Sequence, residues 1–197
     1  MTLESTHPSL LDRLRGAGDD AAWREFDGRY RELILRYALR RGLQPADAED
    51  VLQVAMLQMM RTLPTFQYRP EVGRFRDYLR TVVRRAIHGW AQRQQRHVAL
   101  LHADPEASPD LDRAWHEEWT LHHYRRAMEE VRETFRPESL RIFEGLLAGH
   151  AADELAARHD TTPAAIYKVK QRIRDRLREQ IARQLHEEEF TEQRSRA

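Results

Sequence analysis

Apolar residues recur at helical spacing along almost the whole chain. In the first half, three such series predict helices over residues 23–37, 45–63 and 74–90. A proline suits the first turn of a helix, so the second series begins near Pro45, and Pro64 ends it. Gly42 closes the first series because glycine favours the position after a helix C-terminus.

The second half repeats this pattern after an aperiodic stretch. Periodicity is lost from about His97 to Asp110, where two prolines and a serine mark a linker. Further helices are predicted over 115–135, 137–149, 152–158 and 163–185. Hardly any segment shows the alternation typical of strands, so the fold class is predicted to be all-α.

A chain of 197 residues lies between one large domain and two small ones, and two compact helical lobes fit the pattern better. The expected organisation is a first domain over 1–97, a linker over 98–110 and a second domain over 111–197.

The last two predicted helices have the dimensions of a helix-turn-helix. Their connection, 159–162, is short and polar, Thr162 can cap the second helix, and Pro163 fits its first turn. Ile166, Val169, Ile173 and Leu177 would face inward. In this motif the second helix lies in the major groove with its N-terminal residues near base edges. A helix pair of an ordinary bundle is the alternative.

The formal net charge of +1 hides an uneven distribution. Residues 1–97 carry 17 Arg against 12 Asp/Glu, residues 98–160 carry 7 against 14, and residues 161–197 carry 9 Lys/Arg against 6. Two basic parts separated by an acidic middle predict two contacts with a polyanion. Solvated helix faces are the simpler interpretation.

The predicted helix from Arg74 carries polar and basic residues at intervals of four. They are Arg76, Arg80, Arg84, His88, Gln92 and Arg96. Without partners on their own helix these groups would repel one another, so the series favours an external anion such as a nucleic-acid backbone.

The absence of cysteine excludes disulfides and thiolate metal sites, and a reducing cytoplasm is the expected setting. The N-terminal segment lacks the pattern of a signal peptide, and no stretch approaches the roughly 20 apolar residues of a membrane span. We therefore expect a cytoplasmic protein.

An enzyme is not expected. The sequence from His116 comes close to the HExxH zinc pattern, but Thr120 stands at the second ligand position. His122 and His123 are adjacent and point about 100° apart on a helix, which makes them poor ligands for one ion. With no phosphate-binding glycine loop or nucleophile motif, no catalytic residue, metal or cofactor is predicted.

Three motifs follow one another along the chain, and their order carries a resemblance to a known family. They are DAEDVLQ at 47–53, FRDYLRTV at 75–82, and DELA at 153–156 followed by IY at 166–167 and RIRDRLR at 172–178. Together they resemble the extracytoplasmic-function (ECF) sigma factors of bacterial RNA polymerase, over nearly the whole chain. The first domain is similar to their region 2 and the second to their region 4. The turn at His159 and Asp160 departs from the family's common glycine.

The resemblance implies a set of functional residues. The residues expected to contact the polymerase are Asp47, Glu49, Asp50 and Gln53. In region 2, the residues expected to contact DNA are Phe66, Tyr68, Arg76, Arg80, Arg84, His88 and Arg96. In region 4, they are Tyr167, Lys168, Lys170, Gln171, Arg172 and Arg174. Aromatic rings stack on unpaired bases, cations hold phosphates or guanine edges, and a glutamine can read adenine.

The resemblance also implies a mechanism, in which region 2 docks on core RNA polymerase and captures the melted downstream promoter element, while region 4 reads the upstream element as duplex. An anti-sigma factor is a candidate partner, and the acidic linker is a candidate to cover the basic surfaces in a similar way. Two alternatives stay open. One is a helix-turn-helix regulator that binds duplex DNA without polymerase, and the other is a module that binds only proteins.

Overall fold

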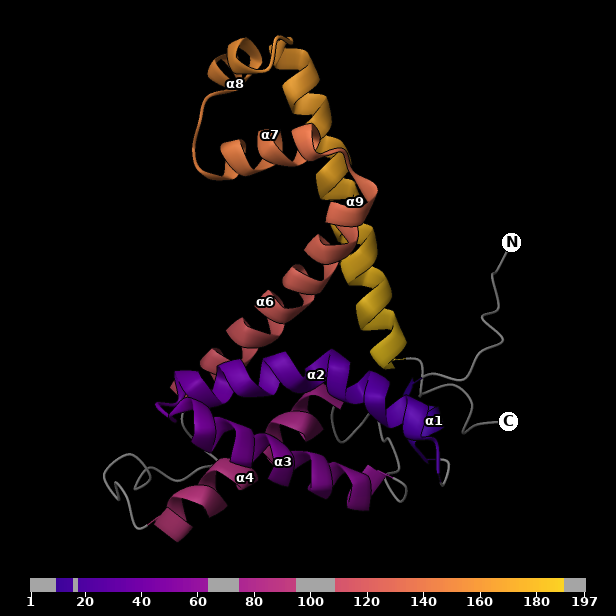
Figure 1. The fold of residues 1–197 in the computed structure, drawn as a ribbon, viewed down its shortest axis with the longest axis vertical. Helices are drawn as coiled ribbons and strands as arrows, with labels where there is room; N and C mark the ends of the chain where they lie inside the picture. The colour runs from indigo at the N-terminus through magenta and orange to yellow at the C-terminus, as the bar shows by residue number, and fades with distance from the viewer. Residues whose placement is uncertain (1–9, 16–17, 64–74, 95–108, 190–197) are drawn as a thin grey trace. The chain divides into compact units, whose positions relative to one another are not determined.

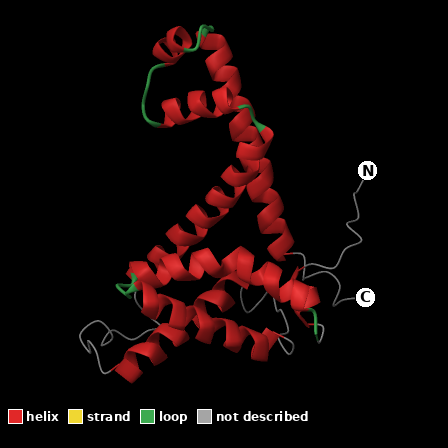
Figure 2. Ribbon diagram, in the orientation of Figure 1, coloured by secondary structure: helices red, strands yellow, loops and turns green. Residues whose placement is uncertain are grey.

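The computed structural model describes residues 10–15, 18–63, 75–94 and 109–189. Within these residues every regular element is a helix, which confirms the all-α class (Figures 1 and 2). The helices are α1 (Leu10–Arg15), α2 (Asp20–Arg40), α3 (Pro45–Thr62), α4 (Phe75–Gln94), α6 (Pro109–Thr134), α7 (Pro137–Leu147), α8 (Ala152–Arg158) and α9 (Pro163–Glu189). None of these helices combines the length and apolar character needed to cross a bilayer.

Local sequence signals set several helix ends. The Asp19 side chain accepts a hydrogen bond from the Ala22 backbone N–H at 2.8 Å and so caps α2. Gly42 has φ +85°, a left-handed conformation that suits glycine after a helix C-terminus. Prolines occupy the first turns of α3 and α7. These helices therefore begin and end close to where the sequence predicts.

The chain divides into two compact units. Unit 1 comprises Met1–Thr120 with His186–Ala197, and unit 2 comprises Leu121–Leu185. The boundary differs from the expected one, since residues 109–120 belong with the N-terminal helices. Trp115 explains this, because it is fully buried and its ring meets that of Tyr37 edge-on at a centroid distance of 5.0 Å.

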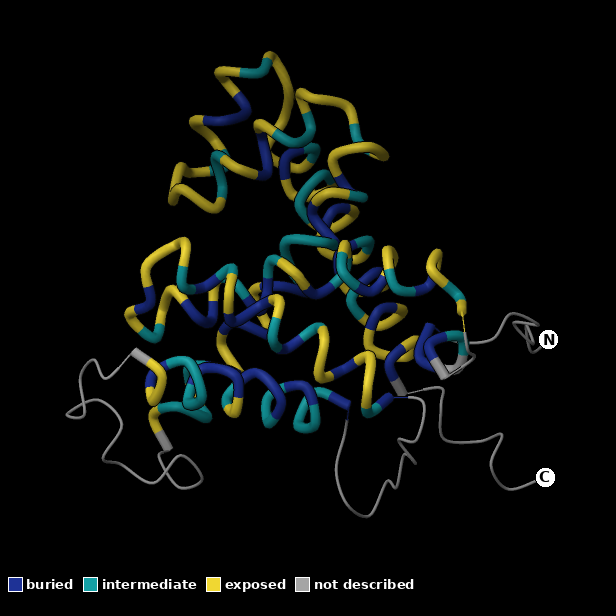
Figure 3. Tube along the Cα trace, turned by 60° about the horizontal axis from the view of Figure 1, so that its bottom comes forward, coloured by how far each residue is buried: buried dark blue, intermediate teal, exposed yellow. Residues whose placement is uncertain are grey.

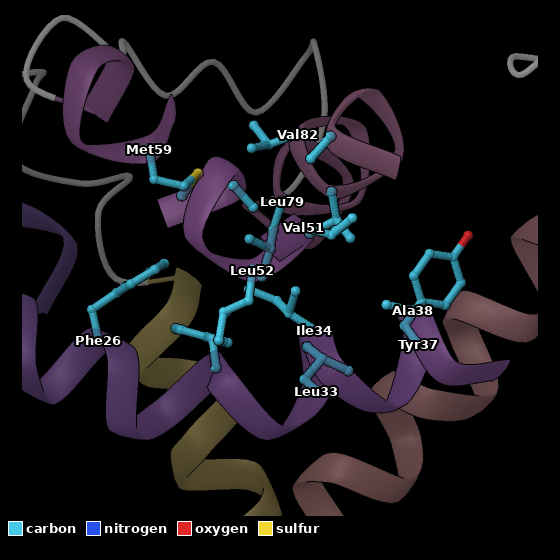
Figure 4. Packing of buried hydrophobic residues seen from close by; sticks show 14 of the residues in the cluster. Phe26, Leu33, Ile34, Tyr37, Ala38, Val51, Leu52, Met59, Leu79 and Val82 are labelled. Carbon is cyan, nitrogen blue, oxygen red and sulfur yellow. The ribbon is translucent and has the colours of Figure 1, made fainter. Parts of the chain in front are cut away.

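The core of unit 1 lies between α2, α3 and α4 (Figure 4). Side chains from the three helices point toward one another, among them Ile34 of α2, Leu52 of α3 and Leu79 of α4. Trp115 and Trp119 from α6 join the same cluster. This packing fixes which faces of α3 and α4 remain open to solvent.

Unit 2 contains two smaller cores. The first unites Met128 of α6, Phe143 of α7 and Ile173 of α9. The second unites residues of α7, α8 and α9, including Leu155 and Ile166. Buried and exposed positions alternate along these helices in the tube of Figure 3. One face of α9 thus supports both cores, while its other face is exposed.

Candidate polymerase and nucleic-acid interfaces

The acidic motif at 47–53 lies on the first two turns of α3. Asp50 and Gln53 are exposed, whereas Asp47 and Glu49 are half-buried. Glu49 pairs with Arg31 of α2, with 2.7 Å between the carboxylate and guanidinium groups. Asp50 and Gln53 are therefore the members of the motif most open to a partner.

The exposed face of α3 extends beyond the motif. Leu57 and Met60 follow Asp50 and Gln53 on the same helical stripe, and their exposed fractions are 53% and 44%. Large apolar side chains in an exposed row with polar neighbours are typical of a protein-binding surface. Sequence reasoning assigned no role to these two residues, although their spacing from Gln53 was the available signal.

The basic series on α4 is only partly as expected. Arg76, Arg80, Arg84 and His88 all lie on α4 and are half-buried, and Arg96 lies outside the described residues. The expectation that the series lacks acidic partners is wrong. Asp77 Oδ1 lies 3.9 Å from both Arg76 and Arg80, and Asp112 Oδ1 lies 2.8 Å from Arg80 Nη1.

The rest of the series carries less neutralisation. Among the described residues, no carboxylate forms an ion pair with Arg84 or with the exposed Arg85. The His88 ring nitrogen and the Gln92 amide lie 2.7 Å apart. The C-terminal half of the α4 face thus keeps its positive charge, and the N-terminal half is close to neutral.

The two aromatic candidates for base stacking are not described by the structure, whereas two other rings on α4 are. Phe66 and Tyr68 lie outside the described residues. Phe75 is buried against Tyr30 and Phe26, and the Tyr78 hydroxyl bonds with Thr62. These last two rings therefore support α4 from within.

The helix pair α8 and α9 has helix-turn-helix connectivity. Asp160 in the turn has φ +47°, a left-handed conformation that aspartate tolerates better than most residues. This residue thus adopts the conformation for which a turn commonly uses glycine. Thr162 Oγ1 accepts a hydrogen bond from the Ala165 N–H at 3.2 Å, as its predicted capping role requires.

The inward face of α9 is as predicted. Ile166, Ile173 and Leu177 are buried, and the half-buried Val169 packs against both cores of unit 2. Gly145 on α7 lets the neighbouring α8 approach closely, because a Cβ atom there would lie 2.8 Å from Leu155 Cδ2.

The outward face of α9 gathers the predicted DNA-binding residues. The exposed members are Lys168, Gln171, Arg172, Arg174 and Tyr167, and the exposed fraction of Tyr167 is 57%. Lys170 is half-buried. Two of them have intrachain partners. The Gln171 amide donates to both carboxylate oxygens of Asp175, at 2.8 and 3.0 Å, and the Arg172 guanidinium lies 5.6 Å from the centre of the Phe135 ring.

No cluster of three or more metal-ligating side chains occurs in the described parts of the chain. His123, one of two adjacent histidines weighed as metal ligands, is buried, and its Nδ1 atom lies 2.8 Å from Gln184 Oε1. This hydrogen bond joins α6 to α9, so His123 has a structural role.

Comparison with known families finds a match over part of the chain. Residues 27–97, which include most of α2 and the whole of α3 and α4, match Sigma-70 region 2. No curated protein matches the chain. The matched range contains the acidic motif of α3 and the basic face of α4. The chain therefore carries a Sigma-70 region 2 domain, which indicates the sigma-70 family.

Proposed function

We propose that the protein is an ECF-type sigma factor, which directs core RNA polymerase to specific promoters and assists initiation. The Sigma-70 region 2 match implies binding to core polymerase and promoter DNA, and it is the observation that carries the proposal. Unit 2 supports the finer assignment, because its helix-turn-helix supplies a second candidate DNA-binding element with the order expected of region 4.

In this proposal, the exposed stripe on α3 docks on the polymerase. Its acidic member, Asp50, and its amide, Gln53, provide polar contacts, while Leu57 and Met60 provide apolar area. Exposed charges steer the encounter and set the register, and a few well-packed side chains near the centre of an interface supply most of the binding free energy. The half-buried Glu49 holds Arg31 and so contributes to the shape of this surface.

Promoter DNA contacts both basic faces. The α9 residues Tyr167, Lys168, Arg172 and Arg174 meet the upstream duplex, since the N-terminal turns of a recognition helix reach base edges and phosphates. The α4 residues that hold the backbone of the downstream element are Arg80, Arg84 and His88. Polymerase supplies the catalysis, so the chain itself has no chemical step to perform.

The decisive experiment is transcription from genomic fragments by core polymerase with and without the purified protein. Specific transcripts that depend on the protein are expected. The paired substitution Asp50→Asn and Leu57→Ser should abolish both transcription and co-elution with core polymerase. Asp20→Asn, which removes an exposed carboxylate from the first turn of α2, is the matched control and should leave both intact.

The alternative is a helix-turn-helix regulator that acts without polymerase. It is favoured only by the geometry of α8 and α9, and it leaves the exposed α3 stripe without a role. Tight, specific duplex binding by the free chain, with no association with core polymerase, would replace the sigma assignment with this one.

A further inference from the structure

A close ion pair joins the first turns of α6 to the basic face of α4. Asp112 Oδ1 lies 2.8 Å from Arg80 Nη1, and the two side chains are 43% and 20% exposed. Asp77 Oδ1 lies 3.9 Å from Arg80 Nη2. The Arg80 guanidinium therefore faces two carboxylates, one from its own helix and one from α6.

The position of Asp112 is fixed by the packing of the following two turns. Trp115 is fully buried beside Tyr37, and the Trp119 ring stacks on Tyr30 at a centroid distance of 6.2 Å. Arg40 of α2 pairs with Glu117 and, at 3.5 Å, with Glu118. The segment that contacts Arg80 is thus itself packed against α2.

A carboxylate and a DNA phosphate are alternative anions for the same guanidinium. Because Asp112 already occupies one edge of Arg80, a phosphate must displace it or accept its repulsion. We propose that the first turns of α6 are an autoinhibitory element of the free protein, in which Asp112 competes with the DNA backbone for Arg80. The inference rests on the proposed function, since it assigns the α4 face to DNA.

The test measures binding of the full chain to a labelled, mixed-sequence single-stranded oligonucleotide by fluorescence anisotropy, at about 0.1 M salt, where charges more than about 10 Å apart are largely screened. A single strand is chosen because the α9 face is assigned to duplex. Asp112→Asn and Asp112→Ala should each tighten binding by about threefold to fivefold, the effect of releasing one partly exposed ion pair.

Asp110→Asn is the matched control. It changes the net charge equally, but Asp110 pairs with Arg113, and both side chains are highly exposed. It should leave the affinity unchanged. Adding Arg80→Gln to Asp112→Asn should remove the gain, which identifies Arg80 as the group released.

Three results would overturn the inference. Equal tightening by Asp110→Asn would show a general charge effect, weaker binding by both Asp112 variants would show that Asp112 orients Arg80 toward DNA, and an affinity unchanged from the native chain would show that no competition exists. Thermal unfolding of each variant checks that the fold is retained. Transcription with core polymerase tests the proposed function separately. If only the inference is wrong, the native chain still directs transcription. If the proposed function is wrong, the native chain directs none.

Discussion

The Tyr30 hydroxyl donates a hydrogen bond to Glu188 Oε1 at 2.8 Å, although 158 positions separate the two residues in sequence. Both belong to unit 1, where the last turn of α9 meets α2. Arg29 and Glu187 form a second link at 3.1 Å beside it. The C-terminal end of α9 is therefore held to the same helix that contributes Tyr37 to the core.

Removing the Tyr30 hydroxyl should destabilise the protein. Tyr30→Phe removes a donor from a buried carboxylate, and we expect the free energy of unfolding to fall by about 1–2 kcal/mol. Urea denaturation followed by circular dichroism provides the measurement. Tyr37→Phe is the control, because the buried Tyr37 hydroxyl has no hydrogen-bond partner among the described residues, and its loss should be nearly neutral. Equal losses for the two variants would contradict this account.

Acid should weaken the N-terminal cap of α2. The Arg13 guanidinium and then the Ala22 N–H hold the pKa of Asp19 below its usual range. A carboxyl group with a lowered folded pKa stabilises the protein above its unfolded pKa of about 4, and this stabilisation is lost as the pH falls through the folded pKa.

The Asp19→Asn variant tests that dependence, because asparagine also caps helices but carries no charge. The stability difference between native protein and variant should be constant above about pH 5 and shrink as the pH falls below about 4. Introducing Arg13→Gln in both should flatten most of this dependence, since Arg13 is the larger cause. A difference that persists unchanged at low pH would rule out the charge interaction.

Two helical glycines should respond in opposite directions to alanine. Gly145→Ala places a Cβ atom 2.8 Å from Leu155 Cδ2 in the core that supports the helix-turn-helix, and should cost about 1–3 kcal/mol. Gly28→Ala on α2 meets nothing within 4 Å and should stabilise by about 0.5–1 kcal/mol by restricting the unfolded chain. Thermal and urea unfolding of the two variants give the comparison; a stabilising Gly145→Ala would show that Leu155 moves aside freely.

Substitutions in the turn of the helix-turn-helix should change the stability of unit 2. Asp160 has φ +47°, so Asp160→Gly should stabilise unit 2 by up to about 1 kcal/mol by relieving the left-handed conformation. Thr162→Ala, which removes the cap of α9, should destabilise by about 1 kcal/mol. Hydrogen exchange at the amides of α8 and α9 measures both effects locally. Faster exchange in Asp160→Gly would mean that the aspartate makes a favourable local contact.

The sequence by itself determined the helical class, the position of most helices and the helix-turn-helix turn. Local rules were sufficient there: Pro45 and Pro163 begin helices, Gly42 follows one, and Thr162 caps the helix that Pro163 begins. The inward face of α9 was also readable, because a period of 3.6 places Ile166 and Ile173 on one side.

Only the tertiary structure decided how the charged faces are used. Asp112 is 32 residues from Arg80, and no periodicity predicts that α6 brings its carboxylate to α4. The same holds for Trp115, which moves residues 109–120 into unit 1, and for Glu188 on Tyr30. Helical periodicity identifies a buried face, but the partner of that face depends on packing between distant segments. For this reason the basic series on α4 was found from the sequence, while the pairing of Arg80 with Asp112 was not.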